Sequence, residues 1–184
     1  MVITRYMKFI ASMRRDFFFF VTSAILMTVS CERIQPEYPD EPVIDYQGFS
    51  LYITVDQLNN KTLVGQLTFD FTDGNGNIGL HALPDTSGLN LPDTLKYNFF
   101  LQLYDLQGFE YVKIPEDEGG VLKYRIPHLD KQPLSGTLDL EISYPVIIHD
   151  TIFYTFYIMD RDYNRSNVDS TEVIVLSGID LDEI

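Results

Sequence analysis

Oxygen-bearing side chains alternate with glycines in the segment 73–79, and side chains of this kind can bind a cation. Carboxylate and amide oxygens at alternate positions are the ligands that Ca²⁺ loops use. The candidate ligands are Asp70, Asp73, Asn75 and Asn77. An EF-hand loop also needs a glycine and a glutamate at positions where this chain has Ile78 and Pro84. The Asp-Gly and Asn-Gly steps equally favour a sharp reversal after a strand that ends at Phe71. We therefore expect a polar turn, with a Ca²⁺ site as the alternative.

A second polar segment separates the apolar runs 152–159 and 172–176. Its candidate ligands are Asp160, Asp162 and Asn164. If the two runs pair as a hairpin, these side chains lie together at one end of the fold. A polar turn is again the simpler interpretation. Ca²⁺ is the only cofactor that the sequence suggests.

Catalytic constellations are missing from the sequence. The three histidines, His81, His128 and His149, have no zinc-ligand spacing, and neither a nucleophile elbow nor a phosphate-binding glycine loop is present. The acidic segment 116–118 is more typical of a solvated turn than of paired glycosidase carboxylates. We therefore predict that the chain is not an enzyme, and we assign no catalytic residue.

The elements that position these loops are short runs in which apolar and polar residues alternate, each bounded by Gly, Pro, Asn or Asp. In the clearest run, Leu138, Leu140 and Ile142 alternate with acidic residues, which predicts a strand with one buried face. The predicted strands are 44–49, 51–55, 63–71, 97–104, 109–114, 121–126, 137–143, 152–159 and 172–176. Their number and spacing predict an all-β fold, an Ig-like antiparallel β-sandwich formed by residues 44–184, with a single closed sheet as the alternative.

The first 30 residues differ from the rest of the chain. Arg14 and Arg15 precede an uncharged, mostly apolar run over residues 17–29, which is followed by Ser30 and Cys31. A basic flank, a short apolar core and a small residue are the parts of a secretory signal peptide, here 1–30. The run is shorter than the roughly 20 apolar residues of a membrane-spanning helix. The only cysteine comes directly after the signal, so we predict that Cys31 carries a lipid.

The exported part is strongly acidic. Without residues 1–30, which contain four basic side chains and one acidic side chain, the chain has 9 basic and 26 acidic side chains and a net charge of −17. Such a charge repels phosphate, so nucleic acid is excluded as a partner. Residues 31–43 contain three prolines among acidic residues, which predicts an extended linker between the lipid and the domain.

Three pieces of sequence together resemble Ig-like envelope lipoproteins of the Bacteroidota. They are the spacer segment 38–44, the Phe-x-Asp-Gly-Asn-Gly-Asn-Ile-Gly stretch over 71–79 and the Asp-Arg-Asp-Tyr-Asn-x-Ser-Asn turn over 160–167, all after Cys31. The group is itself poorly characterised, so the resemblance implies fold and location alone. It implies an outer-membrane, lipid-anchored protein, facing either the surface or the periplasm. It also implies O-glycosylation where Asp precedes Ser or Thr, and the candidates are Thr94, Thr151 and Ser170.

The predicted function is a class of activity. We expect a membrane-tethered, non-enzymatic binding or accessory module, with the segments 81–93 and 115–120 as contact surfaces because recognition usually lies on loops. Its protein or glycan partner is not specified by the sequence. The alternative is a polysaccharide-binding module of a glycan-uptake system. The chain has no Trp for a sugar platform, and the candidate substitutes are Tyr97, Tyr104, Tyr111 and Tyr124.

Overall fold

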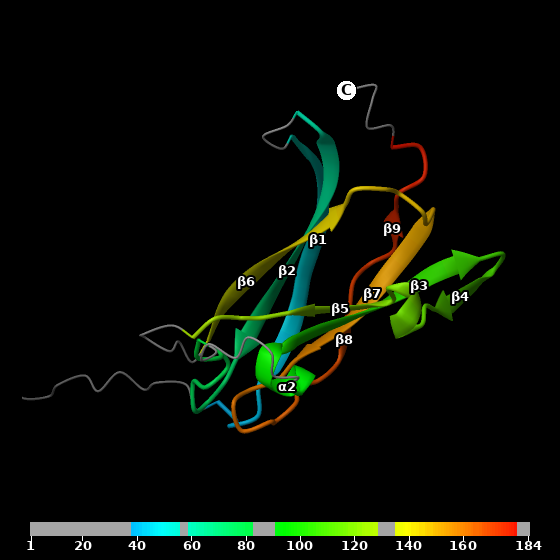
Figure 1. Ribbon diagram of the computed structural model, residues 1–184. Helices are drawn as coiled ribbons and strands as arrows, with labels where there is room; N and C mark the ends of the chain where they lie inside the picture. The colour runs from blue at the N-terminus through cyan, green and yellow to red at the C-terminus, as the bar shows by residue number, and fades with distance from the viewer. Residues whose placement is uncertain (1–37, 56–58, 83–90, 129–134, 180–184) are drawn as a thin grey trace, which may run out of the picture. The chain divides into compact units, whose positions relative to one another are not determined.

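Antiparallel strands form nearly all of the regular structure in the computed structural model, which describes residues 38–55, 59–82, 91–128 and 135–179 (Figure 1). One sheet has the order β1-β2-β6 and consists of β1 (Val43–Val55), β2 (Lys61–Thr72) and β6 (Ser135–Tyr144). The other sheet consists of β3 (Phe99–Gln107), β4 (Glu110–Lys113), β5 (Val121–Tyr124), β7 (Thr151–Ile158), β8 (Asp169–Ser170) and β9 (Ile174–Val175). The described residues also form two short helical turns, α2 (Asp93–Lys96) and η1 (Glu116–Glu118).

The six strands of the second sheet occupy four positions side by side, because two positions are each filled by two short strands. Both β4 and β5 pair with successive halves of β3, while β8 and β9 pair with successive parts of β7. Because β3 and β7 also pair with each other, the effective order is β4/β5, β3, β7, β8/β9. Counting β4/β5 and β8/β9 as one strand each, the first, second and fifth strands form one sheet, as in Ig-type sandwiches. The fourth strand, β4/β5, lies in the other sheet. The predicted all-β sandwich is confirmed.

The first strand differs from the prediction. Residues 44–49 and 51–55 were expected as two strands, whereas β1 is one strand with a bulge between Tyr46 and Gly48. Ile44 and Tyr46 pack towards the core before the bulge, and the odd-numbered residues from Phe49 to Ile53 do so after it. The extra residue of the bulge therefore shifts the alternation of inward and outward side chains, so the sequence pattern looked like two separate strands. The two-residue strand β8 was not predicted.

The core lies between the two sheets. Three fully buried rings join the sheets at its centre, and the Phe69 ring lies 5.3 Å from Phe99 and 5.4 Å from Phe156. Apart from the bulge, every second residue of the long strands points inward, as on β7, where Ile152, Tyr154, Phe156 and Ile158 are buried. The prediction for 137–143 is confirmed, because Ile142 is buried while Asp139 and Glu141 are exposed.

Candidate functional site

The two polar segments predicted from the sequence meet at one end of the sandwich. The first follows β2 and the second connects β7 to β8. The amide Nδ2 of Asn77 donates to Asp162 Oδ2 at 2.8 Å, and the backbone N–H of Arg161 donates to the Asn77 carbonyl oxygen at 3.2 Å. Within the first segment, the N–H of Asn77 donates to Asp73 Oδ2 at 2.7 Å. The expectation that Asp160, Asp162 and Asn164 lie together at the end of a β7 hairpin agrees with this geometry.

The first segment turns sharply but is not a hairpin. Its turn is closed by Gly76 N–H donating to the Asp73 carbonyl oxygen, and Gly76 has a φ of 65°, a conformation that favours glycine. Gly79 lies so close to the Pro127 carbonyl oxygen that a Cβ would come within 2.4 Å of it. The strand after this segment, β3, lies in the opposite sheet, so the segment carries the chain across the sandwich. A turn sequence specifies the reversal but not which sheet receives the next strand.

Asp73, Asn77, Asp160, Asp162 and Asn164 form an end cluster, in which the Asp73 and Asp160 carboxyl groups are buried and Asp162 is exposed. The exposed fraction is 0% for Asp73 and 2% for Asp160. Burial raises the pKa of the Asp73 carboxyl, the Asn77 N–H lowers it, and the nearby Asp160 carboxylate raises it again. Asp160 accepts two hydrogen bonds from Asn164, one from its N–H at 2.7 Å and one from Nδ2 at 2.8 Å.

Two buried oxygens of the end cluster have no hydrogen-bond partner within the described residues. They are Asp73 Oδ1 and Asn77 Oδ1. The N–H groups of Asn75 and Ile78 also lie near the Asp73 carboxylate and lower its pKa, but Asn77 alone forms a hydrogen bond of good geometry with it. Buried polar atoms normally have a partner, so these two oxygens are exceptional.

The other predicted cation ligands lie outside this buried cluster. Asp70 points to the outer face of its sheet and accepts a hydrogen bond from Thr137 Oγ1 at 2.5 Å. The side chain of Asn75 is exposed. In the described part of the chain, no three Asp, Glu, His or Cys side chains are grouped as metal ligands. A cation at this end would therefore need the amide oxygen of Asn77.

The β7–β8 segment has a second, structural role that the sequence analysis missed. Asn167 Oδ1 accepts from Ile44 N–H at 2.8 Å, and Asn167 Nδ2 donates to the Ile44 carbonyl oxygen at 2.9 Å. Asp169 Oδ2 accepts from Tyr46 N–H at 2.7 Å. These side chains link the edge of β1 to the opposite sheet. The Ser-Asn-x-Asp spacing over 166–169 carried no signal for this contact, because its partners are about 120 residues away in the chain.

A groove of about 540 Å³ crosses the outer face of the six-stranded sheet. Its lining includes Phe100, Tyr104, Tyr157, Lys113, Lys123 and Arg165. Phe100 and Tyr157 are paired across β3 and β7, with ring centroids 5.0 Å apart and stacked planes. The Arg165 guanidinium covers Tyr157 at 3.7 Å from the ring centroid. Lys123 forms salt bridges with Asp93 and Glu116, and these raise the pKa of Lys123.

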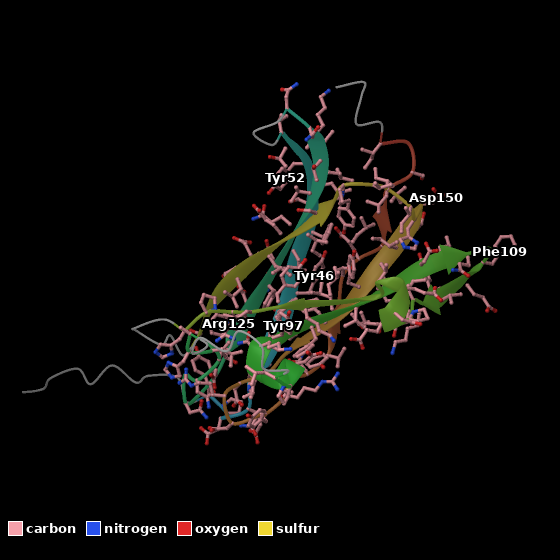
Figure 2. The ribbon with its side chains drawn as sticks, viewed as in Figure 1. Tyr46, Tyr52, Tyr97, Phe109, Arg125 and Asp150 are labelled. Atoms are coloured by element: carbon pink, nitrogen blue, oxygen red, sulfur yellow. The ribbon has the colours of Figure 1, made fainter. Side chains whose placement is uncertain are left out.

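The four tyrosines considered as a sugar platform do not form one. Tyr104 and Tyr111 lie on the sheet around the groove, but the Tyr104 ring stacks on Phe153, with centroids 4.7 Å apart and planes 7° apart. Tyr124 packs against the core, and burial raises its pKa. Tyr97 directly follows α2 (Figure 2). One face of Tyr104 is therefore covered by Phe153, while Tyr111 is exposed.

The β3–β4 hairpin carries a fully exposed apolar ring. Its turn contains Gly108, with a φ of 68°, and Phe109, whose exposed fraction is 102%. Figure 2 shows Phe109 at the tip of this hairpin, pointing away from the sheets. Sequence analysis placed Phe109 at the start of a strand, whereas the strand begins at Glu110.

The predicted modification sites differ in exposure. Thr94 on α2 and Ser170 on β8 are exposed, whereas Thr151 at the start of β7 is half-buried. Asp169, which precedes Ser170, is already hydrogen-bonded to β1. Cys31, the signal peptide 1–30, most of the linker and the segment 83–90 lie outside the described residues.

The histidines are less isolated than the sequence indicated. The rings of His81 and His128 are 3.9 Å apart, and Arg161 Nη1 lies 2.9 Å from His128 Nδ1. His149 Nδ1 lies 3.2 Å from Asp105 Oδ2. These pairs join segments that are distant in the sequence, so spacing along the chain could not reveal them.

Comparison with protein-family models, with curated proteins and with solved structures finds no match to this chain. Among the described residues, no helix has the length and apolar character needed to cross a membrane. The functional argument therefore rests on this chain's own residues.

Proposed function

We propose that this chain is the precursor of an outer-membrane lipoprotein, lipidated on Cys31, whose sandwich is a non-enzymatic binding or accessory module. The support for the anchor is the sequence: a basic flank, a short apolar run and one cysteine directly after it. Two or three acyl chains hold a protein at a membrane firmly, whereas one chain does so marginally. The acidic, proline-containing linker would keep the domain away from the bilayer surface.

The groove on the six-stranded sheet carries the binding part of the proposal. Its floor is formed by aromatic rings, and it contains three of the nine basic residues found after residue 30. Lys123 is already paired with two carboxylates, so Lys113 and Arg165 provide the available positive charge. A protein partner that presents apolar and acidic side chains would be complementary to this surface.

Glycan binding, the alternative, receives less support from the same geometry. Sugar rings stack on the open face of an aromatic side chain. In this groove the Tyr104 face is covered by Phe153, and one face of Tyr157 is covered by Arg165. Two ring faces of the groove are thus already occupied and charged groups lie beside them, which favours a protein partner over a sugar.

The anchor is tested by intact mass and membrane fractionation of natively expressed protein beside the Cys31→Ala variant. We expect a lipid mass on the wild type, which fractionates with membranes, and release of the variant. If both are unmodified and soluble, the anchor is wrong. The same mass spectrum tests glycosylation, because added hexose on the wild type is expected and its absence excludes that modification.

The groove is tested by placing a photo-crosslinking residue at Thr155, inside the groove, and at Glu141, on the outer face of the other sheet. We expect one discrete protein adduct from position 155, which disappears when Arg165→Glu is added. Position 141 is the matched control. Identical adducts from both positions, or none from position 155, would rule out the groove as the binding surface. An adduct that a glycosidase removes would favour the polysaccharide-binding alternative.

A further inference from the structure

The end cluster contains two buried carboxylates, Asp73 and Asp160, near enough for Asp160 to raise the pKa of Asp73. In the described part of the chain, neither Asp73 nor Asp160 forms a salt bridge with a lysine or arginine, although both are at least 98% buried. Arg161 follows Asp160 in the chain, but its Nη1 is bonded to the Gly79 carbonyl oxygen at 2.7 Å and to His128. Buried carboxylates are costly unless a charge or a proton balances them.

The unpartnered oxygens show where a cation would bind. Asp73 Oδ2 is held by the Asn77 N–H, so Oδ1 is the free oxygen of that carboxylate. Asn77 Nδ2 is held by Asp162, which is exposed, and this bond turns Asn77 Oδ1 to the buried side. Each Asp160 oxygen accepts one hydrogen bond from Asn164, which leaves each with further capacity to accept.

We propose that Asp73, Asn77 and Asp160 bind one divalent cation, Ca²⁺ in preference to Mg²⁺, and that Asp162 is a positioning residue for Asn77. All the donors are oxygens, the ligand type that Ca²⁺ requires. The ligands come from two separate loops, and Ca²⁺ accepts such irregular sets with water in the remaining positions, whereas Mg²⁺ demands a near-ideal octahedron. None of the three proposed ligands lines the groove, so this site does not depend on the proposed function.

The test uses the full-length protein in non-ionic detergent, stripped with EDTA and then titrated with CaCl₂ or MgCl₂. Thermal unfolding is followed by tyrosine fluorescence, and binding is followed by calorimetry. Ca²⁺ should raise Tm by about 5–10 °C at a free concentration 100 times its Kd, because binding to the folded state alone stabilises it. Mg²⁺ should give a smaller shift. Tb³⁺ should give emission sensitised by Tyr163, which lies between Asp162 and Asn164.

Matched variants separate this site from other acidic groups. Asp73→Asn and Asp160→Asn should abolish the Ca²⁺ shift. Asp162→Ala, which removes the acceptor of the Asn77 Nδ2 hydrogen bond, should weaken binding about 10- to 100-fold, as loss of an outer partner of a metal ligand does. Asp70→Asn is the control, because Asp70 lies on the outer face of its sheet and can keep its bond to Thr137. Asparagine at position 73 can still accept the Asn77 N–H, so this variant is expected to fold.

Two outcomes would overturn the proposal. Superimposable unfolding curves for the wild type in EDTA, Ca²⁺ and Mg²⁺, with no calorimetric signal, would mean that a shared proton balances Asp73 and Asp160 instead. A Ca²⁺ shift that persists in both Asp73→Asn and Asp160→Asn would place the bound cation elsewhere on this acidic chain.

Discussion

Replacing Asn167 with alanine should destabilise the protein by separating the edge of β1 from the opposite sheet. The side chain makes two hydrogen bonds, at 2.8 and 2.9 Å, with the N–H and carbonyl groups of Ile44. Ile44 is 3% exposed while Asn167 is exposed, so water can replace the lost partner only in part. Each buried backbone group left unpaired costs about 1–3 kcal/mol. Because the two bonds are only part-buried, we expect their combined loss to cost roughly 2–4 kcal/mol.

A loss of this size is measurable against a typical unfolding free energy of about 5–15 kcal/mol. For a domain of this size it corresponds to a decrease in Tm of roughly 4–16 °C. Asn167→Asp gives a sharper comparison. It keeps the acceptor for the Ile44 N–H, but it places a carboxylate oxygen against the Ile44 carbonyl oxygen, so it should be at least as destabilising as alanine at neutral pH.

The assay is urea unfolding of the full-length protein, followed by far-ultraviolet circular dichroism, together with hydrogen exchange at the amides of Ile44 and Tyr46. Val168→Ala is the control, since this neighbouring side chain is 53% exposed. The reasoning is refuted if Asn167→Ala costs no more than Val168→Ala, or if exchange at Ile44 is unchanged. In either case the Asn167 side chain would not be what holds β1 to the opposite sheet.

Three further predictions concern the core and the end cluster. Phe69→Ala should cost about 3–5 kcal/mol in the same unfolding assay, because it removes the ring between the two sheets, whereas Phe109→Ala should change stability by less than about 0.5 kcal/mol. Asn98 is 1% exposed and bonds Ile78 and Ile126 through its amide, so Asn98→Ala should cost about 2–4 kcal/mol, and a loss below about 1 kcal/mol would contradict this. In EDTA, the raised pKa of Asp73 means that the folded state binds a proton at this carboxyl more tightly than the unfolded chain does. Protonation of Asp73 therefore stabilises the folded state fully below the ordinary pKa of 3.8, and this contribution is lost as the pH rises through the raised pKa. Asp73→Asn should remove that part of the pH dependence of the unfolding free energy. An identical pH profile in wild type and variant would show that the pKa of Asp73 is not raised.

Sequence patterns predicted the fold well where one rule applied along a whole strand. The alternation of Leu138, Leu140 and Ile142 with acidic residues predicted β6, because side chains of a strand point alternately to its two faces. The same rule failed at β1, where the bulge after Tyr46 shifts the alternation and one strand reads as two. The strand β8 has two residues, too few for any pattern to form.

The candidate site was partly predictable for a similar reason. The two polar segments were found because Asp, Asn and Gly favour turns, and a β7 hairpin predicted where the second one lies. Their mutual contact could not be predicted, since Asn77 and Asp162 are 85 residues apart and belong to loops after strands in different sheets. The groove was missed because β3 and β7 carry aromatic residues on both faces, so the sequence does not show which of these residues lie on the outer face of the sheet.

The amino-acid sequence by itself determined the strands, their turns, the acidic charge and the prediction of a signal followed by a lipidated cysteine, because each depends on residue types that are close together in the chain. Only the tertiary structure decided which loops meet, which carboxylates are buried and which ring faces are covered. These properties depend on strand order and on the side chains that face each other across two sheets. Burial of Asp73 beside Asp160 is the clearest case, because the desolvation and the charge repulsion that it experiences exist only once β2 and β7 are packed in the same sandwich.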